Sequence, residues 1–267
     1  MLQTLFSIGH FQLHTYGLML ALGFLLGIAV GTRRARATAV DPTFISDLAV
    51  VVILSAILGA RLFYVALNWE EFRGNLLSII NPVQPDGTLG IGGLVFLGGL
   101  VLSFITTLLY TRYRKQPLLE VLDVSMPPLA FGMAVGRIGC FLNGCCYGLP
   151  AALPWAFSFP ADCPAGAYQA AMQVHALHPA QLYMVLGDLL MGLLLILLER
   201  YKRFTGFTTL LFFMFYAVDR SVVDLFRYYP TNELHHGLTH NQIALGILFI
   251  TSATIFMVAW KRSRVRA

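Results

Sequence analysis

Seven long apolar stretches constrain what this chain can fold into. A helix needs about 20 residues to cross about 30 Å of hydrocarbon, and each stretch is close to that length. They cover residues 15–32, 48–67, 91–110, 118–138, 180–198, 206–226 and 242–260. None alternates apolar and polar residues as the strands of a membrane β-barrel do. The sequence therefore predicts an all-α integral membrane protein with about seven transmembrane helices.

The composition agrees with this prediction, since 57% of the residues are apolar and 12% are charged. Soluble domains have about a quarter of their residues charged, so a disordered chain and a typical cytosolic enzyme are excluded. No internal repeat or separate soluble domain is visible, and residues 1–267 are interpreted as a single transmembrane domain. The first stretch lacks the charged leader and the small-residue cleavage site of a removable signal peptide.

Basic residues fall almost entirely on one side of the predicted helices. Of the 18 Lys and Arg residues, 13 follow the first, third, fifth and seventh stretches. These are Arg33, Arg34, Arg36, Arg112, Arg114, Lys115, Arg200, Lys202, Arg203, Lys261, Arg262, Arg264 and Arg266. The positive-inside rule places this side in the cytoplasm, so the N-terminus is predicted outside and the C-terminus inside. The net charge of +5 is thus a topology signal, and no nucleic-acid partner is predicted.

Two longer connections, about 68–90 and 140–178, fall on the predicted outer side and contain Pro, Gly and Trp. The second is too long for a simple turn between helices. We expect it to form a small external cap over the helices.

Four arginines lie inside or at the outer ends of predicted spans, where an unpaired arginine costs several kcal/mol. They are Arg61, Arg137, Arg220 and Arg227. One interpretation is structural pairing with acidic residues, for which the candidates are Glu120, Asp123, Asp188, Asp219 and Asp224. The other is convergence on an anion, since the planar guanidinium matches phosphate oxygens with two parallel hydrogen bonds. Four arginines together favour the anion.

Helical spacing groups these residues on shared faces. Tyr216, Arg220, Asp224 and Arg227 follow at i, i+4, i+8 and i+11 in the sixth stretch. Arg61, Tyr64 and Asn68 share a face of the second stretch, and Gln181 and Asp188 share one of the fifth. Residues at these spacings lie on one side of a helix. Polar faces on several apolar helices predict a polar cavity inside the protein.

Glycine and cysteine gather in two segments. Dense glycine in residues 90–99 favours close helix packing. In residues 132–148, glycines flank Arg137 and could equally let backbone N–H groups approach an anion.

The cysteines are Cys140, Cys145, Cys146 and Cys163. A disulfide between one of the first three and Cys163 is expected, with a reactive thiol at Cys140 or Cys145 as an alternative. No C-x-x-C spacing supports a zinc site with His175 or His178, and neither a metal nor a cofactor is predicted.

Several segments, in order, resemble one known family. They are HTYGLM at 14–19, LGARLFYV at 58–65, GGLVFLGGL at 92–100, GRIGCFLNGCCYG at 136–148, HPAQLY at 178–183, and the sixth stretch with Tyr216, Arg220, Asp224 and Arg227. The chain is similar over nearly its whole length to the prolipoprotein diacylglyceryl transferases of bacterial inner membranes.

The resemblance implies an enzyme that transfers the diacylglyceryl group of phosphatidylglycerol to the lipobox cysteine of a preprolipoprotein and releases glycerol phosphate at the outer face. By resemblance, Arg137 binds the lipid head in a pocket shaped by Asn143 and Gly148. Arg220, positioned by Tyr216 and Asp224, stabilises the leaving phosphate, and Tyr16 orients lipid or acceptor. Preorganised arginines can stabilise such developing charge by several kcal/mol. The remaining residues assigned to substrate binding are His14, Arg61, His178, Gln181 and Arg227.

The sequence departs from the family pattern at four positions. Leu97 replaces a histidine, Cys140 an asparagine, Cys145 a glutamate and Met184 a glutamate. The arginines that the family pattern assigns to the phosphate are present, whereas the groups expected to activate a thiol or bind the acceptor differ from that pattern. Two versions follow: an authentic transferase, or a paralogue that uses the same lipid with another acceptor. A non-catalytic phospholipid-binding or transport protein, and a membrane thiol oxidoreductase, are the alternatives from other classes.

Overall fold

The computed structural model describes residues 3–8, 11–74, 76–79, 93–229, 234–235 and 238–265. The chain divides into two compact units. The first unit comprises residues 1–3, 14–31 and 122–267, and the second comprises 4–13 and 32–121. Of the predicted loop at 68–90, residues 68–74 and 76–79 are described, and the rest lies outside the described residues. Residues 90–92 of the first glycine segment also lie outside them.

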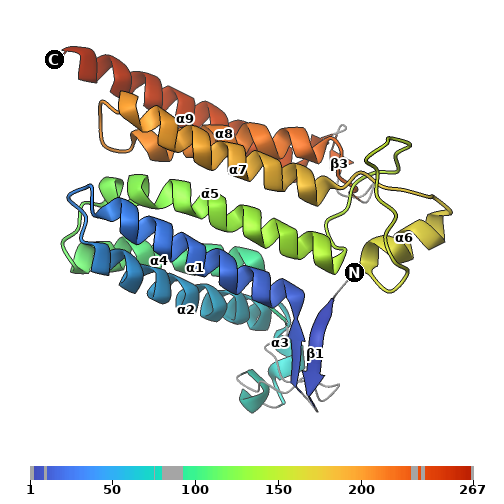
Figure 1. The fold of residues 1–267 in the computed structure, drawn as a ribbon. Coiled ribbons are helices and arrows are strands. Elements are labelled where there is room, and N and C mark those ends of the chain that lie inside the picture. The colour runs from blue at the N-terminus through green and yellow to red at the C-terminus, as the bar shows by residue number, and fades with distance from the viewer. Residues whose placement is uncertain are drawn as a thin grey trace. The chain divides into compact units, whose positions relative to one another are not determined.

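Helices account for most of the described chain (Figure 1). In order, the elements are β1 (Thr4–Ile8), β2 (Phe11–His14), α1 (Thr15–Ala35), α2 (Pro42–Leu67), α3 (Trp69–Phe72), η1 (Leu76–Ile79), α4 (Phe96–Tyr113), α5 (Leu118–Asn143), α6 (Pro164–Met172), α7 (Ala180–Leu198), η2 (Glu199–Tyr201), α8 (Phe207–Asp224), β3 (Leu234–His235), β4 (Leu238–Thr239) and α9 (His240–Val265). The described strands form two short two-stranded sheets, β1–β2 and β3–β4.

Six of the described helices are long and apolar enough to cross a membrane: α1, α2, α4, α5, α7 extended through η2, and α9. Large apolar side chains remain exposed along them, as with Leu54 at 63% and Ile250 at 66%, which suits helices that face lipid. The prediction of an all-α membrane protein is confirmed. The seventh predicted span is α8, a regular helix that is not among the six and carries Asp219, Arg220 and Asp224 within 18 residues.

In the second unit, α2 and α4 pack closely through glycine. A Cβ on Gly98 would meet the Phe63 side chain and the Gly59 carbonyl, and one on Gly99 would lie 2.8 Å from the Ala56 carbonyl. Asp41 caps the start of α2 by accepting a hydrogen bond from the Thr43 N–H at 2.9 Å, as N-cap residues do. The close helix packing expected for residues 90–99 is confirmed for Gly98 and Gly99 in the described part of that segment.

The first unit is built around α5, α7, α8 and α9, with α7, α8 and α9 side by side in Figure 1. Its buried apolar cluster comprises Met126, Ala130, Met191, Leu195, Phe207, Leu211 and Phe212. Pro127 and Pro128 lie inside α5, which is tolerated in membrane helices whose neighbours satisfy the freed backbone groups. The cluster lies toward one end of these helices and leaves the other end for polar residues.

A buried aspartate fixes the turn between α7 and α8. Asp123 is 1% exposed and accepts hydrogen bonds from Gly206 N (2.8 Å), Thr209 N (2.9 Å) and the Thr209 hydroxyl (2.7 Å). Lys202 Nζ lies 2.8 Å from Asp123 Oδ2 and forms an ion pair with it. Asp123 therefore has a structural role, with Lys202 as its partner and not one of the four arginines for which it was a candidate.

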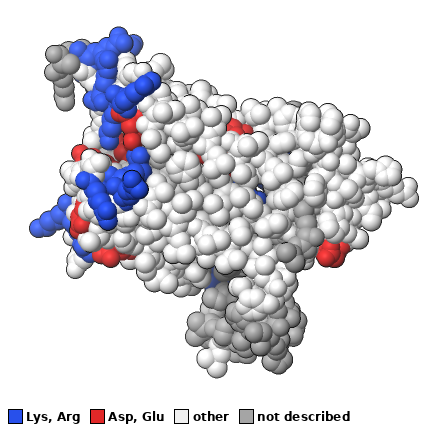
Figure 2. All heavy atoms as spheres, in the orientation of Figure 1, with Lys and Arg blue, Asp and Glu red and all other residues white. Residues whose placement is uncertain are grey.

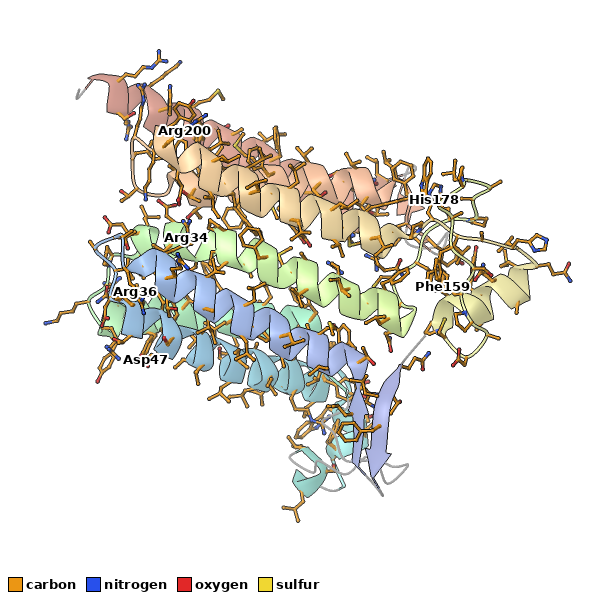
Figure 3. The ribbon with its side chains drawn as sticks, in the orientation of Figure 1. Arg34, Arg36, Asp47, Phe159, His178 and Arg200 are labelled. Atoms are coloured by element: carbon orange, nitrogen blue, oxygen red, sulfur yellow. The ribbon has the colours of Figure 1, made fainter. Side chains whose placement is uncertain are left out.

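Basic residues gather at this same end of the first unit (Figure 2). The Arg203 guanidinium lies 4.6 Å from the centre of the Trp260 ring, and that of Arg264 lies 5.8 Å from it. Figure 3 labels Arg200 beyond the end of α7 and His178 just before its start. The unit thus has a basic end, and an opposite end formed by the C-terminus of α5, the N-terminus of α7 and the C-terminus of α8.

Residues 144–179 fold into a small cap at this opposite end, as the predicted external cap anticipates. Phe159, Cys163, Ala165 and Leu177 form its buried centre. Gln169 holds the loop from both sides, accepting from Phe159 N at 2.7 Å and donating to the His175 carbonyl at 2.7 Å. The cap is thus a folded structure continuous with the helices that carry the polar residues.

Candidate functional site

Arg220 lies in an occupied polar cluster near the end of α8. Its Nη1 is 3.0 Å from Asp224 Oδ1, and its Nη2 donates to the Tyr229 hydroxyl at 3.2 Å. Tyr229 donates to Asp224 Oδ1 at 2.8 Å, and Asn241 on α9 donates to Asp224 Oδ2 at 2.6 Å. Burial raises the pKa of Tyr229, so its hydroxyl stays protonated as the donor to Asp224. Because both carboxylate oxygens are engaged, Arg220 is held in one orientation.

Arg137, six residues before the end of α5, has a different environment. Its half-buried guanidinium makes no hydrogen bond or ion pair with any other described residue. At longer range its charge interacts with Cys140, with Asp188 on α7 and with Tyr216 on α8. Within the part of the chain that the structure describes, its donors therefore have no hydrogen-bond acceptor.

Two buried acceptors on α7 also lack donors among the described residues. Asp188 is 2% exposed and Gln181 is 0% exposed, and Asp188 Oδ2 and Gln181 Oε1 make no hydrogen bond. Gln181 Nε2 donates to the Cys145 carbonyl at 2.7 Å. Buried polar atoms without partners are uncommon in folded proteins. Asp188 interacts electrostatically with Arg137. A guanidinium without described partners and a buried carboxylate oxygen without a described donor are therefore within electrostatic range of each other.

A short extended segment after α5 ties α7 to the residues beyond α8. Gly148 N donates to the His178 carbonyl at 3.0 Å, and Leu149 N donates to the Phe226 carbonyl at 2.8 Å. Gly148 also forms an antiparallel bridge with Arg227. A Cβ on Gly148 would lie 2.5 Å from the Phe226 carbonyl and 2.6 Å from the His178 Cβ. Only glycine fits between the two neighbours without a shift of backbone.

Three thiols meet beside this segment. The Sγ atoms of Cys140, Cys145 and Cys146 lie within 4.8 Å of one another. Gly144 and Cys146 have φ of +69° and +59°, a region that costs a non-glycine residue about 1–3 kcal/mol. Hydrogen bonds with the other two thiols lower the pKa of Cys146, and the Arg227 and Arg137 cations act in the same direction. Hydrogen bonds with Cys140 and Cys146 raise the pKa of Cys145.

The expected disulfide with Cys163 is not formed, and all four cysteines are free. Cys163 caps α6 instead, its Sγ accepting from Gly166 N at 3.5 Å. Sequence spacing could not reveal this, because the left-handed residues at 144 and 146 turn the first three thiols toward one another.

Other predicted site residues have varied environments. Tyr16, at the start of α1, is 39% exposed and interacts electrostatically with Cys140, Cys145 and Arg137. His14 is exposed at the end of β2, and Asn143 is the last residue of α5. Tyr216 stacks on Phe212. The His178 Nδ1 lies 3.0 Å from the Tyr183 hydroxyl.

Two predicted faces end earlier than the sequence spacing implied. Helix α8 ends at Asp224, so Arg227 leaves the predicted stripe and joins the bridge with Gly148. Helix α2 ends at Leu67, and Asn68 caps it by donating to the Tyr64 carbonyl at 2.9 Å. Helical periodicity does not continue past a cap, which explains both differences.

Arg61 belongs to the second unit and is engaged there. Its Nε donates to the Ile79 carbonyl and its Nη2 to the Ser78 carbonyl, each at 2.9 Å. Its guanidinium also lies 5.3 Å from the Phe72 ring centre. These contacts tie α2 to η1, and the predicted part of Arg61 in substrate binding stays a prediction.

A groove among the described residues lies at the basic end, away from the polar residues. It has a volume of about 810 Å³ and is lined by Arg203, Phe204, Thr254 and Arg262, among others. It contains none of the predicted site residues, so the site is assigned by side-chain chemistry and not by cavity size.

Comparison with known proteins decides the family. Residues 3–259 match the model of the prolipoprotein diacylglyceryl transferases. The chain belongs to the prolipoprotein diacylglyceryl transferase family. A phosphatidylglycerol–prolipoprotein diacylglyceryl transferase of Finegoldia magna is 30% identical over 263 residues, 98% of this chain and 97% of the relative. Its counterpart from Synechococcus elongatus is 34% identical over 253 residues, 92% of this chain and 80% of the relative. Another, from Parasynechococcus marenigrum, is 34% identical over 203 residues, 74% and 67% of the two chains.

The positions at which this family member departs from the expected pattern lie in different places. Met184 is buried and its Sδ accepts from Arg220 Nη1 at 3.5 Å, so a neutral acceptor stands beside that cation. Cys140 and Cys145 belong to the thiol cluster. Leu97 lies on α4 in the second unit and is 53% exposed.

Sequence reasoning missed Tyr229 and Asn241, which complete the environment of Asp224. Tyr229 follows the end of α8, and Asn241 lies in the first turn of α9, 17 residues after Asp224. No local pattern links an asparagine to a carboxylate at that separation. The positive φ at Cys146 is likewise a property of the folded backbone.

Proposed function

We propose that this family member transfers the diacylglyceryl group of phosphatidylglycerol to the lipobox cysteine thiol of preprolipoproteins, in the bacterial inner membrane. The observation that carries the assignment of the site is the guanidinium of Arg137, which has no described partner and lies among α5, α7 and α8 residues. The oxygens of a phosphodiester match that planar donor group, as those of a carboxylate do, and phosphatidylglycerol carries a phosphodiester.

The two arginines have separate tasks in this proposal. Arg137 receives the phosphate of the incoming lipid with its free donors. Arg220 is fixed by Asp224 and Tyr229 and supplies a preoriented positive charge. The acceptor sulfur attacks the carbon of the diacylglyceryl group that is bonded to the phosphate oxygen. The C–O bond breaks, and its electron pair passes to that oxygen. Preoriented cations in a water-poor site stabilise that developing charge without reorganisation.

The head-group glycerol accounts for the buried acceptors on α7. Its hydroxyls can donate to Asp188 Oδ2 and Gln181 Oε1, which lack donors among the described residues. A choline head has no such donors and would leave both acceptors unsatisfied, at a cost of about 1–3 kcal/mol each. Asp188 and Gln181 are therefore proposed to select a hydroxylated head.

The arrangement of charge supports an active site toward the outer face. The first unit carries Arg200, Lys202 and Arg203 at the end opposite to Arg137. With that basic end in the cytoplasm, the N-terminus of α1, the cap and the arginine site face outward. Preprolipoprotein and phosphatidylglycerol are then both available at the outer leaflet.

The test is a product assay with the full chain in liposomes that contain labelled phosphatidylglycerol, together with a lipobox peptide. Mass spectrometry should detect a diacylglyceryl thioether on the peptide cysteine, and none with a serine peptide. Replacement of phosphatidylglycerol by phosphatidylcholine should abolish the product. Binding of labelled lipid without peptide modification, beside an active control enzyme, would refute the acceptor and favour a paralogue with another acceptor.

A further inference from the structure

Cys140, Cys145 and Cys146 form a compact group of ligands of one chemical type. Their Sγ atoms lie within 4.8 Å of one another. Three thiolates on a tetrahedral zinc ion lie about 3.8 Å apart, given a Zn–S distance of about 2.3 Å. The upper limit of 4.8 Å on the observed separations is about 1 Å longer than this spacing.

The surroundings hold the group in place. Cys140 is buried on α5, and Cys145 and Cys146 are half-buried on the turn that follows. The Gln181 amide donates to the Cys145 carbonyl and ties this turn to α7. Three thiolates and one divalent ion carry a net charge of −1, and the Arg137 and Arg227 cations lie within electrostatic range of Cys146 to offset it. The positive charges of Arg137 and Arg227 therefore favour the complex of three thiolates with one divalent ion.

We propose that Cys140, Cys145 and Cys146 bind one thiophilic divalent metal ion of the zinc class and leave its fourth position open to the acceptor thiol. Zinc sites with three protein ligands and one exchangeable position are the catalytic type. Soft thiolate ligands select such ions over magnesium or calcium. The half-exposed Cys145 and Cys146 leave a route to the fourth position.

This inference rests on the proposed function, which requires a thiolate nucleophile. A thiol bound to zinc is deprotonated: the peptide RSH loses its proton to water, and RS⁻ takes the fourth position. The sulfur then attacks the carbon of the diacylglyceryl group that is bonded to the phosphate oxygen, and a C–S bond forms. The C–O bond breaks, and glycerol phosphate leaves with the electron pair. The thioether product is a poor ligand and dissociates. The metal thus makes a general base unnecessary by lowering the pKa of the bound thiol, and it is neither oxidised nor reduced.

Metal binding is tested first and without any activity readout. The full chain, purified in detergent, reduced and freed of metal with a chelator, is titrated with Co²⁺ and separately with Zn²⁺. One equivalent should bind, with sulfur-to-metal charge-transfer absorption for Co²⁺. Cys140→Ser, Cys145→Ser and Cys146→Ser should each weaken binding by more than the about 10–100-fold cost of losing an outer-shell partner.

Cys163→Ser is the matched control. Cys163 is buried within the same cap but belongs to the N-terminus of α6, where serine is itself a good capping residue. This variant should bind the metal as the native chain does and unfold at a similar temperature. Equal binding by the native chain and Cys146→Ser, or an air-stable disulfide within the cluster in place of metal binding, would overturn the proposal.

The open position is tested by adding the lipobox peptide to the Co²⁺ form. Charge-transfer absorption should increase as a fourth sulfur binds, and a serine peptide should leave the spectrum unchanged. An unchanged spectrum with the cysteine peptide would overturn the assignment of the fourth position.

The outcomes separate this inference from the proposed function. Full transfer activity after metal removal would refute the proposed role of the metal in activating the acceptor thiol and leave the transferase assignment intact. Metal and peptide binding without any thioether from phosphatidylglycerol would refute the transferase assignment and leave the metal site intact.

Discussion

Arg61 in the second unit and Arg137 in the first unit differ in what their guanidinium groups contact. Arg61 donates to the carbonyls of Ile79 and Ser78 and faces two aromatic rings. Arg137 has no hydrogen bond or ion pair with any described residue. The donors of Arg61 hold a short helix in place, whereas those of Arg137 have no described acceptor and are the ones we propose to bind the lipid phosphate. The presence of an arginine in an apolar helix therefore does not by itself indicate its role, and the partners of its donors must be compared.

Arg220 is the intermediate case in this comparison. It is engaged by Asp224 and Tyr229, yet its neighbours are side chains and not backbone carbonyls. Asp224 orients the guanidinium of Arg220, and this pair does not bind the backbone of a described connecting segment as Arg61 does. This distinguishes a positioned charge from a structural clamp, and four predictions test the distinction.

The largest effect is expected from Asp224→Asn. It removes one charge of the buried pair with Arg220, whose side chains are 10% and 0% exposed. Breaking a buried pair from one side costs about 3–5 kcal/mol. Thermal unfolding in detergent should show a marked loss of stability together with a loss of transfer. A variant with native stability would show that Arg220 does not depend on Asp224.

Arg137→Gln should lower transfer by about 10²–10³-fold, the effect of removing one stabilising donor group. Arg137→Lys should remain well below the native rate, because a point charge does not reproduce the planar donor group. Stability should change little, since no described partner is lost. Initial rates in liposomes, with an unfolding curve for each variant, provide the measurement. Native rates for Arg137→Lys would remove Arg137 from the site.

Gly148→Ala should destabilise the segment that joins α7 to the residues after α8. The added Cβ would lie 2.5 Å from the Phe226 carbonyl, and overpacking of this kind costs about 1–3 kcal/mol. Gly17→Ala is the control, because a Cβ there meets nothing within 4 Å. Unfolding temperatures of the two variants should differ clearly. Similar temperatures would mean that the segment shifts without cost.

The smallest effect is expected from Arg61→Lys. It weakens two hydrogen bonds to carbonyls, each worth about 1 kcal/mol. Hydrogen exchange at residues 76–79 should become faster, whereas the ratio of kcat to KM for phosphatidylglycerol should change by less than for Arg137→Lys. A larger effect on turnover than on exchange would support the predicted place of Arg61 among the substrate-binding residues.

Much of the fold could be predicted from the sequence, because helix length and lipid contact are set locally. Stretches near 20 apolar residues became long helices, and glycine at 98 and 99 marked a close helix contact. Ends of helices were less predictable: Asp224 closes α8 before Arg227, and Asn68 closes α2. A cap depends on hydrogen bonds to groups outside the helical repeat, which periodicity does not encode.

The sequence by itself determined that the chain is an apolar helical membrane protein, that its basic residues are segregated, and which segments match the family. Only the tertiary structure decided which arginine keeps its donors, which acid orients Arg220, and which cysteines meet. The first group of properties depends on the composition and spacing of neighbouring residues. The second depends on contacts between distant segments, such as Asn241 with Asp224 and Gln181 with Cys145, and on the left-handed backbone at Cys146.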